Sequence, residues 1–412
     1  MTEARNLLPK ATFSAKFGLT IALVVVGLAG RTAVDKVLAL RGGAELVALW
    51  AQISSVIEVV VGVVAAGVGT GLVVYVARSK RLAVQHEHLH EALRIGLRVA
   101  LPVALAIGTA GWVLSDLLSG GKIAPWAFAI AAVAGCIGVI PMLVSNCWLG
   151  QQRYGLMLAM AVAQTAVVLV ASYAAPEASV LVWIAVVQAS PALVLILLPK
   201  ATSASERFRR RAHPIRRYIL PGLSIGILSP LSMLLARSIV GEAISWHDAG
   251  VFQALFRVAD WICTFAGSYL SLRYLPCFAA ARSGPALAAE LLNAAKTTLL
   301  PSAIALGALF LLHRPLLAML YDPGVQASGV AAGLFFAGSL VRIASWIPLL
   351  ALYTMRRTRE IAVGELLSLP LFVVLMIAAG NLLTLELAGA LWLFAFCAYA
   401  AFNLLAVRRI RA

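Results

Sequence analysis

Charged side chains interrupt several apolar segments of the chain, and their types and positions could support chemistry. A charge at the centre of a bilayer costs about 2.5 to 3.5 kcal/mol on insertion scales, so it faces protein or water and usually marks a function. The cations are Arg31, Lys36, Arg98, Arg237, Arg257, Arg273 and Arg342. The anions are Asp35, Glu58, Asp260 and Glu365. Because the cations outnumber the anions, we expect a net positive interior.

The spacing of these residues places several of them on shared helix faces. Arg31 and Asp35 are four residues apart and therefore share one face. Gln52, Ser55 and Glu58 step by three and form a polar stripe. Glu58 lies about 18 Å from the outer end of its predicted helix at 1.5 Å per residue, which is close to the middle of the bilayer.

A later segment repeats this arrangement. Gln253, Arg257 and Asp260 form a similar polar stripe, Arg342 lies near mid-depth of another segment, and Glu365 lies nearer the inner face. Arg342 has no charged residue within one turn of its own helix, and the same holds for Glu58 in the first stripe. Both residues therefore require a partner from another helix or a ligand.

A positive interior with interspersed carboxylates suits an anionic substrate, most simply a phosphate or pyrophosphate group, which arginine binds as a planar fork. The residues predicted to bind substrate in a cationic cavity are Arg31, Lys36, Arg98, Arg237, Arg257 and Arg342. Membrane carboxylates can also take up H⁺ or Na⁺ and couple the ion to movement. The residues predicted for polar or coupling roles are Asp35, Gln52, Glu58, Gln253, Asp260 and Glu365.

These charges also have purely structural interpretations. Arg31 with Asp35, and Arg257 with Asp260, can form satisfied pairs within one helix. The long side chains of Lys36, Arg237 and Arg273 can instead extend along apolar surface to a membrane interface. The spacing alone leaves these alternatives open.

Composition indicates which elements must position the charges. Of the 412 residues, 62% are hydrophobic and 12% are charged, against roughly 45 to 50% and about 25% in soluble domains. We therefore predict an all-α, polytopic membrane protein of about twelve transmembrane helices. The expected helices span 17–40, 46–77, 95–118, 124–149, 155–174, 179–199, 219–241, 249–272, 291–312, 328–354, 361–380 and 384–406. In the second helix, Gly67, Gly69 and Gly71 predict a bend.

The basic residues predict the orientation of the chain. With both termini in the cytoplasm, the outer loops hold only Arg41, Lys122 and Arg314, whereas most other lysines and arginines outside the spans fall on the inner side. This asymmetry follows the positive-inside rule, so the net charge of +16 is a topology signal and not a sign of nucleic-acid binding.

The longest polar break divides the chain into two halves of six predicted helices each. We predict an N-terminal lobe at 1–200, a basic cytoplasmic linker at 201–218 and a C-terminal lobe at 219–412. Lys36 and Gln52 correspond to Arg237 and Gln253, each 201 residues later. Equal halves with the same orientation predict a parallel repeat around a central cavity.

Little in the sequence suggests bond-making chemistry. The five cysteines lie scattered in apolar segments without metal-ligand spacing, and no nucleotide-binding loop is present. We therefore expect no catalytic residues, no metal and no cofactor beyond a possible coupling ion, H⁺ or Na⁺.

Residues 34–77, VDKVLALRGGAELVALWAQISSVIEVVVGVVAAGVGTGLVVYVA, resemble the opening of Wzx-type lipid-linked oligosaccharide flippases of the multidrug/oligosaccharidyl-lipid/polysaccharide exporter (MOP) superfamily. The shared features are the KVLA end of the first helix, a Gly-rich short outer loop, an AQ-containing second helix and G-x-G-x-G. Residues 245–282, SWHDAGVFQALFRVADWICTFAGSYLSLRYLPCFAAAR, resemble the start of the second half of that family. The branch that the chain resembles is that of the O-antigen translocases and enterobacterial common antigen (lipid III) flippases.

The resemblance implies a V-shaped, two-lobed flippase. It would move undecaprenyl-pyrophosphate-linked oligosaccharide from the cytoplasmic to the periplasmic leaflet of the bacterial inner membrane by alternating access. The partners it implies are this lipid-linked glycan, membrane lipids and, in the cell, a polysaccharide polymerase and a chain-length regulator, with the protein itself a monomer. The family has a cationic central cavity.

Two other functions compete with this interpretation. A drug or cation antiporter of the same superfamily is expected to have a more acidic or neutral cavity. A membrane-embedded polysaccharide polymerase or ligase is expected to carry a large outer loop with catalytic residues, and no predicted outer loop exceeds about fifteen residues, too short for a separate catalytic region.

Overall fold

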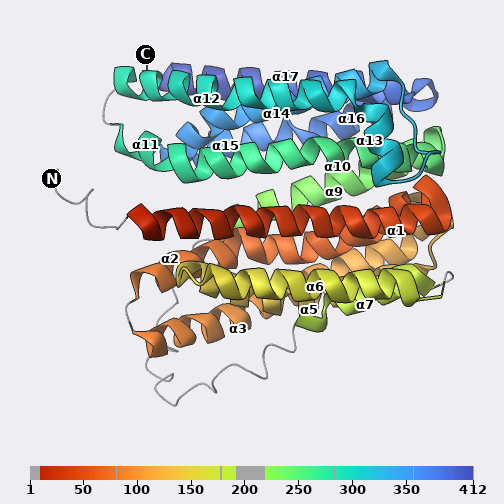
Figure 1. Ribbon diagram of the computed structural model, residues 1–412, viewed down its shortest axis with the longest axis horizontal. Coiled ribbons are helices and arrows are strands. Elements are labelled where there is room, and N and C mark those ends of the chain that lie inside the picture. Colours follow the sequence, from red (N-terminus) through yellow and green to blue (C-terminus); the bar gives the residue numbers. More distant parts are fainter. Residues whose placement is uncertain are drawn as a thin grey trace. The chain divides into compact units, whose positions relative to one another are not determined.

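The computed structural model describes residues 10–79, 81–176, 179–191, 219–281, 284–355 and 357–411, so the predicted linker at 201–218 lies outside it. Within these residues every regular element is a helix (Figure 1). The helical segments long and apolar enough to cross a membrane are Ile21–Arg78, Leu82–Val113, Pro125–Gly150, Tyr154–Ala174, Gly284–Leu311, Gly329–Thr354, Arg359–Leu382 and Leu385–Arg409. The chain is thus an all-α, multi-pass membrane protein, as predicted, whereas the number twelve stays a prediction.

The first two predicted helices are present as the two arms of α1, which meet at a glycine pair. α1 (Lys10–Val64) changes direction at Gly42 and Gly43, which have non-helical backbone angles. Gly43 has a φ of 66°, a left-handed conformation that glycine adopts without steric cost. The predicted outer loop is therefore a sharp kink between two arms of α1.

The predicted bend in the second helix is also present. The π-helix η2 (Ala65–Gly69) follows α1 and leads into α2 (Thr70–Arg78). Its last three residues, Gly67, Val68 and Gly69, are buried. A π-turn of this kind interrupts the regular hydrogen-bond ladder of a helix, which accounts for the bend that the glycines indicate.

The chain divides into two compact units. Unit 1 comprises Met1–Val34, Val56–Trp112 and Trp126–Gly226. Besides parts of α1, it contains most or all of η2, α2, α3 (Leu82–Val113), α5 (Pro125–Gly150), α6 (Tyr154–Ala174) and α7 (Val180–Gln188). α3 begins before the predicted start at 95, because the preceding amphipathic stretch continues the helix. Small residues let these helices approach closely, as where Gly135 of α5 lies against Ile57 and Val60.

Unit 2 comprises Asp35–Ser55, Val113–Pro125 and Ile227–Ala412. Its helices after α4 (Ser115–Ser119) are α9 (Ile219–Ala243), α10 (Trp246–Tyr269), η6 (Leu270–Tyr274), α11 (Leu275–Ala280), α12 (Gly284–Leu311), α13 (His313–Leu320), α14 (Gly329–Thr354), α15 (Thr358–Leu366), α16 (Leu369–Ala379), η7 (Gly380–Leu382) and α17 (Leu385–Arg411). The core contains a group of stacked and edge-to-face rings formed by Phe252, Phe335, Phe372, Trp392 and Phe396.

Unit 2 includes two segments from the N-terminal half of the sequence. In one of them, the second arm of α1 comes into backbone contact with α10, because a Cβ added at Gly250 would collide with the carbonyl of Ala44. Only glycine allows so close an approach. The predicted lobe boundaries at 200 and 219 stay a prediction.

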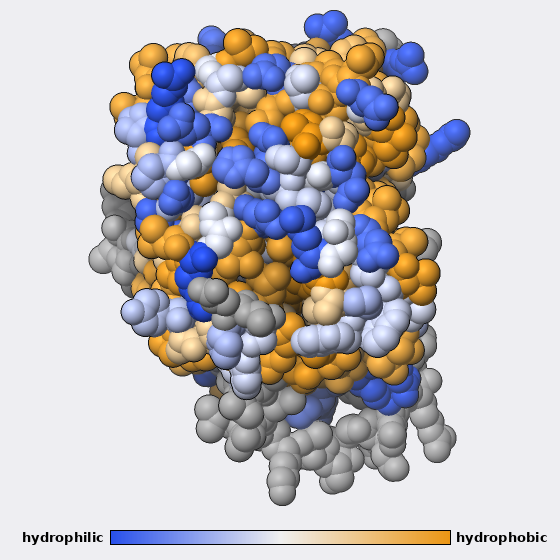
Figure 2. All heavy atoms as spheres, turned by 90° about the vertical axis from the view of Figure 1, so that its right-hand side faces the viewer, coloured by the Kyte–Doolittle hydropathy of each residue, from blue (hydrophilic) through white to orange (hydrophobic). Residues whose placement is uncertain are grey.

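The surface has the polarity expected of helices that end in water. Figure 2 faces the side of the structure on which α13 lies, and hydrophilic residues gather across this end. Large hydrophobic side chains are exposed along the helices, for example Leu105 in α3, Val170 in α6, Leu300 in α12 and Phe394 in α17. In a membrane protein such side chains contact lipid.

Candidate functional site

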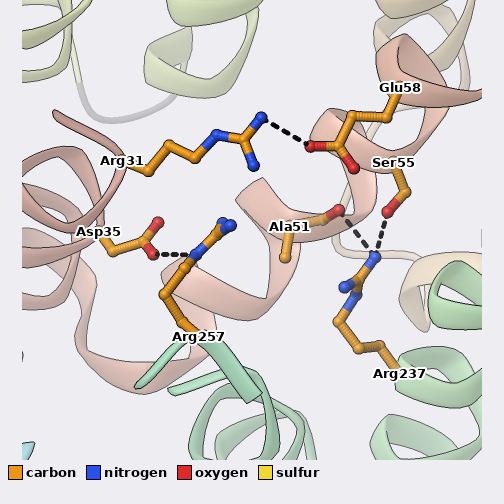
Figure 3. A network of polar contacts seen from close by, with 7 residues as sticks. All are labelled: Arg31, Asp35, Ala51, Ser55, Glu58, Arg237 and Arg257. Atoms are coloured by element: carbon orange, nitrogen blue, oxygen red, sulfur yellow. Dashed lines mark hydrogen bonds and ion pairs between the residues drawn. The ribbon is translucent and has the colours of Figure 1, made fainter. Parts of the chain in front are cut away.

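The most extensive polar network of unit 2 surrounds Arg237 of α9, which is 3% exposed. One guanidinium nitrogen donates to Gln253 Oε1 of α10 at 2.8 Å. Another donates to the carbonyl of Ala51 at 3.0 Å and to Ser55 Oγ, both in the second arm of α1 (Figure 3). The Nε atom lies 3.4 Å from Gln52 Oε1. Arg237 thereby joins three helical segments, and its buried donors are well satisfied.

The two glutamines of this network are the residues that the sequence repeat relates. Gln52 and Gln253 are both fully or almost fully buried, and each directs its side-chain oxygen at Arg237. The amide nitrogen of Gln52 donates to Ser238 Oγ and to the carbonyl of Leu118, each at 2.8 Å. The equivalent polar positions of the two halves therefore meet at one arginine inside unit 2.

A buried ion pair lies in the same unit. Arg257 Nε of α10 donates to Asp35 Oδ2 of α1 at 3.1 Å (Figure 3). Arg257 is 8% exposed and Asp35 is 1% exposed. Two charges withdrawn from water in this way stabilise each other, and removal of one takes an ion-pair partner from the other.

Lys36 follows Asp35 and reaches a different part of unit 2. Its Nζ donates to the backbone carbonyl of Tyr321, beyond the end of α13, at 2.6 Å. The side chain of Tyr321 is fully buried. Burial and the negative charge of Asp35 hold the pKa of Tyr321 well above its ordinary value, so its hydroxyl keeps its proton.

A third charged group lies among aromatic rings. Arg342 of α14 donates to Asp260 Oδ1 of α10 at 3.3 Å. The centre of its guanidinium lies 5.1 Å from the Trp346 ring and 5.8 Å from the rings of Phe256 and Phe396. These distances fit cation–π interactions, which favour a partly desolvated arginine. The side chain of Arg342 keeps 16% of its surface exposed, so it is reachable from solvent.

Unit 1 contains a charged pair of another kind. Arg31 of the first arm of α1 and Glu58 of the second arm point toward each other (Figure 3), with 3.6 Å between the guanidinium nitrogen and the carboxylate oxygen. Their side chains are 57% and 46% exposed. The distance exceeds that of a good hydrogen bond, so Arg31 is held loosely and is open to a ligand.

Three predicted residues lie in other elements. Arg98 of α3 and Arg273 of η6 are exposed. Glu365 of α15 accepts a hydrogen bond of 2.8 Å from the hydroxyl of Tyr399 of α17. The predicted substrate-binding set is divided between the two units, with Arg31 and Arg98 in unit 1 and the other members in unit 2, and its role in binding substrate stays a prediction.

The structure corrects the expected pairing of the charges. The intrahelical pairs Arg31–Asp35 and Arg257–Asp260 are wrong, since Arg31 pairs with Glu58 and Arg257 with Asp35. Helix-surface spacing permits the intrahelical contacts, but packing brings a carboxylate from another helix segment to each arginine, buried for Arg257 and exposed for Arg31. The requirement that Glu58 and Arg342 find partners outside their own helical segments is confirmed.

The side chains of Arg237 and Lys36 both donate to acceptors within unit 2. Their extension to a membrane interface, like that of Arg273, stays a prediction. Sequence reasoning missed Tyr321, Ser238 and Tyr399 as partners of the charged groups. A tyrosine or serine in an apolar segment gives no distinct signal, because these residues are common there without a special role.

The chain matches no protein-family model and no curated protein. Its fold matches solved transporters. Lipid II flippase MurJ in an inward closed conformation aligns with a TM-score of 0.68 and 12% identity over 96% of this chain and 87% of that chain. An inward-facing multidrug resistance MATE family transporter of the MOP superfamily gives 0.64 and 13% over 96% and 94%.

A MOP superfamily transporter from Pyrococcus furiosus also aligns, with a TM-score of 0.63 and 15% identity over 96% of this chain and 95% of that chain. Its structure is described as having a binding pocket of reversed polarity that suggests a different function. At these identities the similarity establishes the fold. The chain therefore has the fold of MOP superfamily transporters.

Proposed function

We propose that the protein is a flippase that moves an undecaprenyl-pyrophosphate-linked oligosaccharide across the bacterial inner membrane, from the cytoplasmic to the periplasmic leaflet, by alternating access. The cargo is an O-antigen or enterobacterial common antigen repeat unit. The observation that carries the proposal is the exposed Arg31–Glu58 pair at membrane depth. The fold supports it, because that fold also serves a lipid II flippase.

The depth of the pair excludes a surface that faces lipid. Arg31 precedes the kink at Gly42 by eleven residues, or about 16 Å of helix, in a bilayer core about 30 Å thick. The free-energy cost of exposing a charge to acyl chains at this depth is too high for a stable membrane helix. Arg31 and Glu58 therefore face water or a polar cargo, and a membrane helix that lines such a space is typical of a transporter.

The sign of the charge supports an anionic cargo. Cations outnumber carboxylates among the embedded groups, and three arginines are each matched by one carboxylate. A pyrophosphate offers oxygen acceptors in the planar arrangement that guanidinium groups bind best. In the proposed mechanism Arg31 binds the pyrophosphate when it releases its loosely held partner Glu58.

Coupling to an ion gradient is part of the proposal. Glu58 and Asp260 are partly exposed carboxylates, each beside an arginine. When the arginine turns to the cargo, the carboxylate can bind H⁺ or Na⁺ and so keep the site's charge balanced. A polysaccharide polymerase and a chain-length regulator are the proposed partners that use the translocated lipid.

The test is translocation in proteoliposomes. The purified protein is reconstituted with a fluorescent polyprenyl-pyrophosphate oligosaccharide, and a membrane-impermeant quencher reports the fraction in the outer leaflet. We expect protein-dependent exchange for the wild type and its loss in Arg31→Gln. Arg314→Gln, which changes an exposed arginine of α13, is the matched control and is expected to behave as wild type. Exchange no faster than in empty liposomes for every glycan tested would contradict the proposal.

Drug export is the second candidate, because solved multidrug MATE transporters share the fold. A cationic drug would meet a positively charged interior, which opposes its binding. Overexpression should therefore leave the resistance of a drug-sensitive strain to cationic dyes unchanged. A rise in resistance that Glu58→Gln abolishes would favour the antiporter instead.

A further inference from the structure

Arg98 of α3 lies on a helix face that the described part of unit 1 leaves uncovered. Leu101 and Leu105 follow it at helical spacing on the same face, and they are 56% and 63% exposed. The opposite face is closely packed, because a Cβ added at Gly96 would lie 3.0 Å from the side chain of Leu143 in α5. Exposed leucines of a membrane helix contact lipid, so Arg98 stands on a lipid-facing surface.

The predicted repeat makes α12 the counterpart of α3, and α12 has the same arrangement. Lys296 is exposed, and Leu300 and Ile304, which follow at intervals of about one turn, are each 65% exposed. Both cations lie fifteen residues before the last residue of their helix, which is Val113 in α3 and Leu311 in α12. Each half of the chain therefore places one exposed cation at the same point of a lipid-facing helix.

This point corresponds to the border between acyl chains and headgroups. Fifteen residues of helix span about 22 Å at 1.5 Å per residue, in a hydrocarbon core about 30 Å thick. A long cationic side chain covers the remaining distance of about 8 Å by extending along the helix toward the headgroups. The charge thus reaches the level of the lipid phosphates, in the leaflet that the distribution of basic residues predicts to be cytoplasmic.

The two cations also lack a partner of the kind that the other embedded arginines have. Arg31, Arg257 and Arg342 each meet a carboxylate. In the described part of the chain, no carboxylate lies within ion-pair distance of Arg98 or Lys296. An uncompensated cation at a membrane interface attracts a negatively charged headgroup. The surrounding lipid can therefore supply the anion that the chain does not.

We propose that Arg98 and Lys296 each bind the phosphate of an anionic phospholipid, such as phosphatidylglycerol, in the cytoplasmic leaflet. At Arg98 the acyl chains lie along Leu101 and Leu105. An anionic phospholipid fits better than a zwitterionic one, because its headgroup carries no amine that competes with the protein cation for the phosphate. Arg98 is thereby assigned to lipid and not to the central cavity that the sequence predicted for it. The assignment does not depend on which cargo the protein carries.

The test counts the phospholipids bound to the purified, delipidated full-length protein. Native mass spectrometry with equimolar phosphatidylglycerol and phosphatidylcholine should show about a fivefold preference for phosphatidylglycerol in the wild type. Arg98→Gln and Lys296→Gln should each lose one of two preferred lipids, and the double variant should bind both lipids equally. Arg314→Gln removes the same charge from an exposed position of α13 and should keep the preference. A wild-type preference in the double variant would overturn the proposal.

A second measurement separates lipid binding from folding. Without lipid, the thermal unfolding midpoint of the double variant in detergent should equal that of the wild type, because both residues are exposed. Added phosphatidylglycerol should raise the midpoint of the wild type more than that of the double variant, because a ligand stabilises the state that binds it. Arg98→Lys keeps the charge and should restore most of the rise in an Arg98→Gln comparison. Equal rises in the wild type and the double variant would contradict the proposed sites.

Polyprenyl pyrophosphate is the other lipid that carries a phosphate group to this depth, and the same mass spectra distinguish it. Binding of polyprenyl pyrophosphate that Arg98→Gln abolishes, with phosphatidylglycerol binding left intact, would assign Arg98 to the cargo and overturn the proposal. Phosphatidylglycerol binding that is lost in Arg98→Gln supports the lipid site, even in a protein that translocates no lipid-linked glycan. That last result would reject the flippase alone.

Discussion

Arg237 in unit 2 and Arg31 in unit 1 are both arginines in the membrane-embedded part of the chain, but their surroundings differ. Arg237 is 3% exposed and donates to side-chain and backbone oxygens of two other helices. Arg31 is more than half exposed, and its partner oxygen on Glu58 is 3.6 Å away. Arg237 thus stabilises the packing of unit 2, whereas Arg31 is exposed and loosely paired, as the proposed cargo site requires. Residue type and depth alone did not separate these roles.

The largest expected effect is a loss of stability when a buried arginine is replaced. Arg237→Met should lower the free energy of unfolding by roughly 3 to 5 kcal/mol, because several buried oxygens lose their donor, each at about 1 to 3 kcal/mol with partial relaxation. Arg257→Ala should cost a similar amount, about 3 to 5 kcal/mol, because it leaves Asp35 without this partner. Denaturant unfolding in detergent measures both values. A loss below about 1 kcal/mol for Arg237→Met would remove the contrast with Arg31.

The next largest expected effect is a loss of transport when the exposed Arg31 is replaced. Arg31→Gln should lower translocation of a pyrophosphate-linked glycan about a hundredfold, as expected for a lost charged contact worth roughly 3 kcal/mol. The free energy of unfolding should change by less than about 0.5 kcal/mol, because the residue is exposed and loosely paired. The proteoliposome assay and denaturant unfolding of the same preparation give both numbers. An Arg31→Gln protein that is destabilised but still translocates the glycan would show that Arg31 has a structural role instead of a role in cargo binding.

Replacement of Arg342 should affect both transport and stability, each to an intermediate extent. Arg342→Ala is expected to lower export of surface glycan about tenfold or more, while the protein still inserts in the membrane. The reason is that the Arg342 side chain is partly exposed and forms an ion pair with one carboxylate, that of Asp260. The free energy of unfolding should fall by about 1 to 2 kcal/mol, because the aromatic rings lose their contacts with the guanidinium group. Arg342→Lys is the informative control, since it keeps the charge but not the planar fork. Wild-type glycan levels in Arg342→Ala would argue against a role in cargo binding.

The smallest expected effect concerns the pair of repeat-related glutamines. Gln52→Leu and Gln253→Leu should each lower the free energy of unfolding by about 1 to 2 kcal/mol, because each leaves Arg237 with one acceptor fewer. Gln52 also donates to Ser238 Oγ and to the carbonyl of Leu118, so Gln52→Leu should be the more destabilised of the two variants. Denaturant midpoints of the two variants in one detergent test the order.

Much of the fold could be predicted from the sequence, because long apolar runs predict membrane helices. The bend at Gly67 to Gly71 and the positions of α5, α6 and α14 followed from composition and breaks in hydrophobicity. The break between the two arms of α1 followed in the same way, because Gly42 and Gly43 interrupt the apolar run and have non-helical backbone angles.

The charges of the candidate site could be found from the sequence, but their pairing could not. Arg31, Arg257 and Arg342 are rare charges in apolar segments, and each meets a carboxylate in the structure. Which carboxylate each arginine meets depends on how distant helices pack, since Arg257 meets Asp35 and not the expected Asp260. The contact of Lys36 with Tyr321 could not be found from sequence, because a backbone carbonyl acceptor gives no sequence signal. The roles of these residues in binding a cargo stay predictions.

The central claim is that position 31 faces a water-filled, cargo-binding space while position 237 is sealed in protein. The direct measurement is the reaction of Arg31→Cys and Arg237→Cys with a charged, membrane-impermeant thiol reagent, in chains whose five native cysteines are replaced by alanine. We predict rapid reaction at position 31, slowed by a pyrophosphate-linked glycan, and no reaction at position 237 in the folded protein. An unreactive position 31, or one that the glycan does not protect, would contradict the account.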